Sequence, residues 1–291
     1  LVATDELGNS SSVKFSIDKT PPAISGLDLN SSNYYYNRDV TITFNEGNAT
    51  LNDQPYISGT KISKEGNYQI RVEDGNGNAI IAPFVIDKTA PAAPTANDIS
   101  SAMTKVTGTT EPDSKVTIKA GSKIIGTAQT YQDGLYSINI PKQKSLSKLL
   151  ITATDKAGNT SPAKELTIKD GEKPVISNIQ ADFIPVNSNF DPKAGVVAKD
   201  DVDGDITKAL KVTSNVNTKV PGWYTLTYSV SDKAGNIETV TKKVRVVDST
   251  APIISGVADK TIAINSIFDS RVGITAKDNA DGDLTRSIKV S

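Results

Sequence analysis

Apolar and polar residues alternate along much of this chain. The alternation is clearest in residues 68–72, 116–118, 136–140 and 224–230, where Val, Ile, Leu or Tyr takes every second position. Successive side chains of a strand point to opposite faces of a sheet, so this pattern predicts strands with one buried face. No segment has a convincing helical period. Short strands separated by regular turn signals predict an all-β sandwich or barrel.

A five-residue turn motif, Asp-x-x-Gly-Asn, occurs four times along the chain. The copies begin at Asp5, Asp74, Asp155 and Asp232. An alternating segment precedes the motif and another follows it, which places the motif in the last hairpin of a sandwich, between strands F and G. Glycine and asparagine suit such turns because both tolerate positive φ.

Two tyrosines stand at the expected start of strand F. Tyr68 follows Gly66-Asn67, and Tyr224 follows Gly222-Trp223. A tyrosine at this position forms a tyrosine corner when its hydroxyl bonds the backbone of the preceding turn. We therefore expect Tyr68 and Tyr224 to tie the turn between strands E and F to the sandwich.

Four aspartates, each followed within a few residues by a proline, divide the chain into units. They are Asp18, Asp87, Asp170 and Asp248, and successive ones lie 69, 83 and 78 residues apart. These spacings suit a small sandwich domain. The expected modules are, in order, residues 1–18 (the last strands of one module), 19–87, 88–170, 171–248 and 249–291 (the first half of another).

The last two repeats match each other without a gap. Phe190, Asp200 and Asp205 recur as Phe268, Asp278 and Asp283, each 78 residues further on. Three matches in one register indicate a true repeat rather than chance. A tandem array in which each module contacts only its neighbours follows from such repetition.

Composition excludes several kinds of chemistry. The chain has no cysteine and no histidine, so disulfides, zinc sites of the Cys/His kind and Ser-His-Asp or Cys-His catalysis are excluded. Its 32 basic and 33 acidic residues form no basic stripe, so nucleic acid is not an expected partner. The longest apolar stretch, residues 79–86, is far shorter than the roughly 20 residues of a membrane-spanning helix.

Residues 88–170 resemble the bacterial Ig-like repeats of long adhesins. The segments that carry this resemblance are residues 106–109, 111–116, 133–136 and 153–159. Residues 171–248 and 249–291 resemble Ig-like domains of bacterial surface proteins with an Asp-Gly-Asp-hydrophobic-Thr signature, here Asp203-Gly204-Asp205-Ile206-Thr207. The resemblance implies tandem immunoglobulin-like β-sandwich modules in an elongated array.

Clustered aspartates suggest calcium ligands. In an Ig sandwich the B–C and F–G loops share one end with the module's N-terminus, so side chains from three segments should meet there. Oxygen ligands from several segments suit calcium. The first candidate site comprises Asp170, Asp200, Asp201, Asp203, Asp205, Asp232 and Asn236. The second comprises Asp248, Asp278, Asn279, Asp281 and Asp283.

An alternative interpretation needs no metal, and the sequence favours it. Aspartate and asparagine are common turn residues because their side chains bond nearby backbone. The run is not an EF-hand loop, since Gly204 and Val212 stand at the wrong positions. Tyr34-Tyr35-Tyr36 and Trp223 are candidates for stacking on sugar rings, but a lone Trp is more often a core residue.

The leading functional hypothesis is a non-catalytic spacer that presents an adhesive or catalytic head, stiffened by calcium if the aspartates bind it. Its expected partners are the neighbouring modules of the same chain. Its expected localisation is extracellular, either at the cell surface or cell wall of a Gram-positive bacterium or as a secreted protein. Two alternatives remain: a module that binds a host protein or glycan directly, and an accessory segment of a secreted carbohydrate-active enzyme or S-layer protein.

Overall fold

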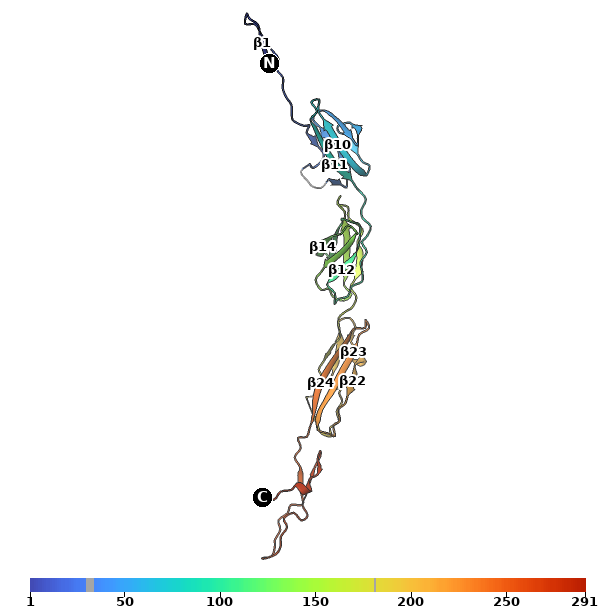
Figure 1. Cartoon of the computed structure of the whole chain (residues 1–291). Coiled ribbons are helices and arrows are strands. Elements are labelled where there is room, and N and C mark those ends of the chain that lie inside the picture. Colours follow the sequence, from blue (N-terminus) through green and yellow to red (C-terminus); the bar gives the residue numbers. More distant parts are fainter. Residues whose placement is uncertain (30–33, 181) are drawn as a thin grey trace. The chain divides into compact units, whose positions relative to one another are not determined.

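The computed structural model describes residues 1–29, 34–180 and 182–291, and these consist mainly of strands and loops (Figure 1). Helical structure in these ranges is limited to two short 3-10 turns, η1 (Thr207–Ala209) and η2 (Thr285–Ser287). No helix in the described ranges is long and apolar enough to cross a membrane. The expected all-β class is confirmed.

The chain forms two compact units. The first unit comprises Leu1–Ile99, Thr104–Gln143 and Ser147–Ile168, and the second comprises Ser100–Met103, Lys144–Leu146 and Lys169–Ser291. The first unit contains two sandwich cores, and the second contains one core followed by a smaller sheet. Each core belongs to one stretch of sequence, as expected for tandem modules.

The first unit begins with a hairpin, β1 (Val2–Thr4) and β2 (Ser10–Ser12), and continues with a sandwich. One sheet has the order β4-β11-β10-β7-β8, and the short pairs β3–β6 and β5–β9 complete the fold. Val40, Ile42, Ile70 and Phe84 meet in its core. The strands are β3 (Ile24–Ser25), β4 (Tyr35–Tyr36), β5 (Val40–Thr41), β6 (Thr43–Phe44), β7 (Asn48–Leu51), β8 (Gln54–Tyr56), β9 (Lys61–Ile62), β10 (Gly66–Glu73) and β11 (Ala79–Ile86).

The second sandwich of this unit pairs β12 with β15 and has a four-stranded sheet of order β14-β13-β16-β17. Tyr136 is buried in its core and donates its hydroxyl proton to the carbonyl of Thr95 (2.6 Å). Gly108 makes room for this bond, because a Cβ there would lie 2.6 Å from the Tyr136 hydroxyl. The strands are β12 (Lys105–Thr109), β13 (Lys115–Ala120), β14 (Lys123–Gln129), β15 (Leu135–Asn139), β16 (Lys148–Thr154) and β17 (Lys164–Thr167).

The second unit opens with a sandwich of two sheets, β18-β20-β21 and β19-β24-β23-β22. Leu226, Tyr228, Val230 and Val244 are buried between them. A further sheet, β25-β26-β27, repeats the order of β18-β20-β21. The strands are β18 (Val175–Ser177), β19 (Phe183–Pro185), β20 (Val197–Asp200), β21 (Gly204–Asp205), β22 (Lys211–Ser214), β23 (Gly222–Ser231), β24 (Ile237–Val247), β25 (Ile253–Ser255), β26 (Thr275–Asp278) and β27 (Gly282–Asp283).

The Asp-x-x-Gly-Asn motifs form the predicted hairpin turns. In the turn between β10 and β11, the Oδ1 atom of Asp74 accepts the backbone N–H groups of Asn76 and Asn78, and the Asn78 amide donates to Oδ2 (2.7 Å). Gly77 has a φ of 88°, a left-handed conformation that glycine adopts at low cost. The motif is therefore a self-contained turn whose first and last side chains close on each other.

Both predicted tyrosine corners are present. Tyr68 donates its hydroxyl proton to the carbonyl of Lys64 (2.7 Å), and Tyr224 donates to the carbonyl of Val220 (2.8 Å). Both side chains are half-buried and pack against the cores of their sandwiches. These bonds fix the turn that leads into β10 or β23.

Removing one of these bonds should weaken its sandwich. Tyr224→Phe keeps the ring and loses the hydroxyl, so we expect a loss of about 1 kcal/mol in the free energy of unfolding. Tyr131→Phe in the second sandwich of the first unit is the control, because Tyr131 is 68% exposed. Urea titration followed by tryptophan fluorescence measures Tyr224→Phe, and circular dichroism measures Tyr131→Phe, whose own module should keep its midpoint. Equal midpoints for Tyr224→Phe and the unmodified chain would contradict the role assigned to the corner.

Candidate metal centres at the linker aspartates

Asp200 combines burial with an unsatisfied oxygen. It ends β20 and is 9% exposed. Its Oδ1 atom accepts the backbone N–H groups of Val202 and Asp203 (both 2.9 Å), which folds the chain back into β21. Its Oδ2 atom is buried and has no hydrogen-bond partner. A buried carboxylate oxygen without a partner is costly, and a cation beside it would offset that cost.

Two further carboxylates lie close to Asp200. Asp170, Asp200 and Asp201 each bring an oxygen within 4.8 Å of the others. Asp170 belongs to the linker before β18, and its Oδ1 atom accepts protons from the Ser145 hydroxyl and the Glu172 backbone N–H (both 3.1 Å). Three carboxylates converging from a linker and a loop offer hard oxygen ligands of the kind that calcium prefers.

The same arrangement recurs in the following repeat. Asp248, Asp278 and Asp281 also lie within 4.8 Å of one another through their oxygens. Asp278 accepts the N–H groups of Asp281 and Ala280 on Oδ1, and these bonds are the main cause that lowers its pKa. Its Oδ2 atom is buried and unpartnered, like that of Asp200. Both the grouping of three carboxylates and the unpartnered Oδ2 atom recur, so they are properties of the repeat.

The two groups differ in their third member. Asp201 completes the first group, whereas its counterpart 78 residues on is Asn279, which has no carboxylate. Asp281 takes part there instead. Its own counterpart in the module of residues 171–248 is Asp203, which instead accepts hydrogen bonds from the backbone N–H (2.7 Å) and the ammonium (2.9 Å) of Lys233. These two bonds hold the pKa of Asp203 below its ordinary value.

The remaining predicted ligands take part in turns. Asp205 accepts the Thr207 N–H (2.9 Å), and Asp283 accepts the Thr285 N–H (2.9 Å). Hydrogen bonds from the threonine side chains, and after them these backbone bonds, lower the pKa of both carboxyl groups. The side-chain amide of Asn236 donates a hydrogen bond to the carboxylate of Asp232 (2.8 Å). The structure thus brings together Asp170, Asp200 and Asp201, and separately Asp248, Asp278 and Asp281, out of the twelve predicted residues.

Two residues that bond predicted ligands of the first candidate site were absent from the sequence prediction. Lys233 lies next to Asp232 in the F–G turn, at the end of the sandwich where the aspartates were expected, but topology alone does not show that its side chain reaches Asp203. Ser145 lies in the preceding module and reaches Asp170 through a loop. Nothing in the sequence pattern signals that contact.

Asparagine side chains hold the linkers of the first unit. The side-chain amide of Asn78 donates to the backbone carbonyl of Asp18 (3.3 Å), and that of Asn159 donates to the carbonyl of Asp87 (2.9 Å). In both cases the last residue of the Asp-x-x-Gly-Asn turn fastens the linker that leads into its own module. The turn motif therefore has a second role that its sequence does not reveal.

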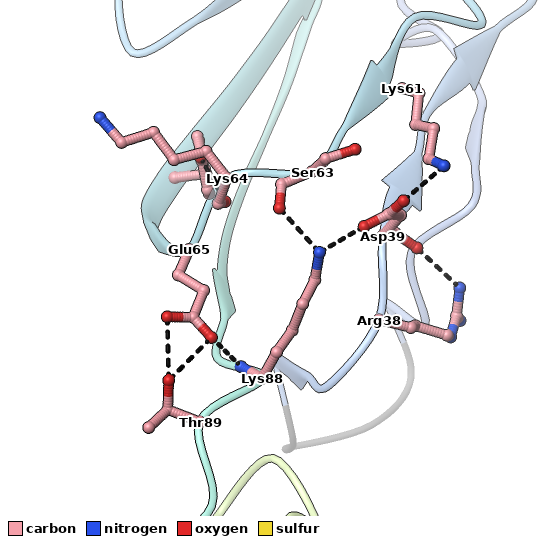
Figure 2. A network of polar contacts seen from close by, with 9 residues as sticks. Arg38, Asp39, Lys61, Ser63, Lys64, Glu65, Lys88 and Thr89 are labelled. Atoms are coloured by element: carbon pink, nitrogen blue, oxygen red, sulfur yellow. Dashed lines mark hydrogen bonds and ion pairs between the residues drawn. The ribbon is translucent and has the colours of Figure 1, made fainter.

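The linker after β11 is also fastened by charge. Figure 2 shows Lys88 reaching Asp39 and the carbonyl of Ser63 (2.7 Å), while Glu65 accepts the Lys88 backbone N–H (2.6 Å) and the hydroxyl proton of Thr89 (3.1 Å). Lys61 and Lys88 together hold the pKa of Asp39 far below its usual range. Because Lys88 lies in the linker and its partners lie in the preceding sandwich, this network ties the start of the linker to that sandwich.

The aromatic residues depart from one expectation. Trp223 is 66% exposed, so the assignment of a lone Trp to the core is wrong. Its neighbour Tyr224 faces the core and forms the corner described above, and strand alternation therefore turns Trp223 outward. Tyr35 and Tyr36 form β4 and are half-buried.

Two family models match the middle of the chain. Residues 90–170 match the bacterial Ig domain, and residues 179–246 match the Ig-like domain of bacterial surface proteins.

Two curated proteins are similar to parts of this chain. The pesticidal crystal protein Cry22Aa of Bacillus thuringiensis is 36% identical over 113 residues, which is 37% of this chain and 16% of that protein. An uncharacterized 81.3 kDa protein of Acholeplasma phage L2 is 35% identical over 81 residues, 27% of this chain and 11% of that protein. The chain thus spans less than a fifth of either relative.

The solved structures to which the chain is similar are distant. A Ca2+-stabilized adhesin of an Antarctic bacterium is 16% identical with a TM-score of 0.32, covering 85% of this chain and 80% of that one. Fibronectin(III)-like modules of CbhA from Clostridium thermocellum are 15% identical with a TM-score of 0.32, covering 51% and 94%. No functional conclusion follows from similarity at this level.

Proposed function

We infer that this chain, which carries tandem bacterial Ig-like domains, is a non-catalytic spacer of a bacterial cell-surface or secreted protein. The observation that supports this role best is that three successive stretches of sequence each have a hydrophobic core of their own. Short proline-containing linkers connect them, and proline restricts the backbone there. An array of this kind can hold two parts of a protein apart, and this role requires no binding pocket.

We further propose that the two acidic groups bind calcium. The support is the recurring, buried and unpartnered Oδ2 atom of Asp200 and Asp278, which a turn alone does not require. In the first group the ion would be held by Asp170, Asp200 and Asp201, with the remaining ligand positions filled by backbone oxygens or water. Because Asp170 belongs to the linker, calcium would join the linker to the loop after β20 and restrict its motion.

The spacer role makes a prediction about size in solution. A compact globule of this length would have a radius of gyration of about 19 Å. We expect the full chain to be monomeric by light scattering and to have a radius of gyration well above that value by small-angle X-ray scattering. Calcium should narrow the distribution of sizes relative to EGTA, because it restricts the linkers. A monomer with the radius of a compact globule would contradict the spacer role.

A further inference from the structure

The single tryptophan of the chain lies on the outer face of a sheet. Trp223 is the second residue of β23 and is 66% exposed, although tryptophan is mostly buried in folded proteins. The next residue on the same face, Thr225, is small and polar, and so are Thr239 and Thr241 on the neighbouring strand. An exposed indole ring in one row with a second exposed aromatic ring, that of Phe183, favours a role in binding.

Trp223 is part of a row that crosses three strands. It lies directly opposite Arg245 of β24, whose guanidinium carbon is 5.9 Å from the centre of the indole ring. On the other side of Arg245 lies Phe183 of β19, which is 63% exposed. The row spans two strand spacings, or about 10 Å. The contact with the indole ring positions the guanidinium and leaves its N–H donors available.

A second cation lies beside the row. Lys243 stands two residues before Arg245 on the same strand face and opposite Thr225. With Trp223, Tyr224 and Thr225 it lines a shallow hollow of about 370 Å³. Among the residues that the structure describes, neither Lys243 nor Arg245 has an ion-pair partner, whereas the adjacent Lys242 pairs with Asp182 (3.0 Å). The row therefore presents two uncompensated positive charges next to an exposed aromatic face.

We propose that Trp223, Lys243, Arg245 and Phe183 form a binding site for a uronic-acid saccharide. The indole ring offers a flat apolar surface for the C–H face of a pyranose ring, and the guanidinium fork matches a planar carboxylate. A neutral sugar would leave both cations unpaired. A protein partner would need about 800 Å² on each side, more than these four side chains provide. The site shares no residue with the acidic groups, so it is independent of the spacer and calcium proposals.

The single tryptophan makes the test direct. Titration of the full chain with oligogalacturonate, in the presence of EGTA, should give a saturable change in tryptophan fluorescence. A malto-oligosaccharide of the same length, which lacks carboxylates, should give none. Raising the salt concentration should weaken the binding because the cations are exposed.

Variants separate this site from nonspecific attraction. By calorimetry, Trp223→Ala, Lys243→Gln and Arg245→Gln should each weaken oligogalacturonate binding by about tenfold or more. Arg245→Lys keeps the charge but loses the fork, so it should recover only part of the affinity. The matched controls are Tyr131→Ala and Lys123→Gln, an exposed aromatic and an exposed lysine of the other unit, and both should bind like the unmodified chain. Circular dichroism confirms that each variant folds.

Three results would overturn the proposal. The first is no saturable response to oligogalacturonate. The second is equal loss of affinity in the control variants. The third is binding of dextran sulfate at least as tight as that of oligogalacturonate, which would mean a cationic patch without selectivity for a carboxylated sugar.

Discussion

Replacing Leu226 by alanine should destabilise the module of residues 171–248 by about 2–5 kcal/mol, because the side chain is removed from a fully buried position. Leu226 lies in the middle of β23 and packs in the core between the two sheets. Trp223 lies on the same strand and is the only tryptophan, so its fluorescence follows this module alone. Guanidinium titration should show a lower midpoint with an unchanged slope.

The matched variant is Leu149→Ala. Leu149 is also fully buried, but it belongs to the second core of the first unit. If stability is a sum of local terms, Leu149→Ala should lower a transition seen by circular dichroism and leave the fluorescence transition in place. A shift of the fluorescence midpoint as large as that caused by Leu226→Ala would mean that the modules unfold as one cooperative unit.

Calcium should raise the melting temperature of the same module. At a free calcium concentration of 100 times Kd, binding to the folded state alone adds about 2.7 kcal/mol. For a domain of this size that corresponds to a rise of about 10 °C or more over the value in EGTA. Fluorescence-monitored melting of the full chain measures the difference, and magnesium should give a smaller one because it tolerates less irregular ligand geometry.

Asp201→Asn is the most informative variant for the calcium effect. It removes one carboxylate of the first group without touching the bonds that Asp200 makes to the turn, so the melting temperature in EGTA should hardly change while the calcium increment falls. Asp205→Asn is the control, because Asp205 bonds Thr207 and lies outside the group. Superimposable melting curves with and without calcium would mean that these aspartates act only as turn residues.

The sequence predicted the backbone well because the relevant signals are local. Alternation from Tyr224 to Val230 is enough to define β23, and the Asp-x-x-Gly-Asn turn carries its own hydrogen bonds. The tyrosine corners follow in the same way, since the hydroxyl and the carbonyl it bonds are four residues apart.

The candidate sites could be predicted only in part because they depend on contacts between distant segments. Topology placed Asp170 near Asp200, but it could not rank Asp201 above Asp203, because that choice depends on where Lys233 reaches. Composition alone assigned Trp223 to the core. Its true orientation is set by the neighbouring Tyr224, which occupies the inward position on the strand.

The placement of each acidic group has a consequence for how such arrays evolve. When the repeat is counted from its linker aspartate, each copy holds its own loop aspartates, with Asp170 before Asp200 and Asp248 before Asp278. A gene duplication or deletion whose breakpoints fall just before these linkers therefore gains or loses a module together with its complete acidic group. The array can change in length by whole repeats of this type while each remaining copy keeps its own set of carboxylates, without compensating substitutions elsewhere.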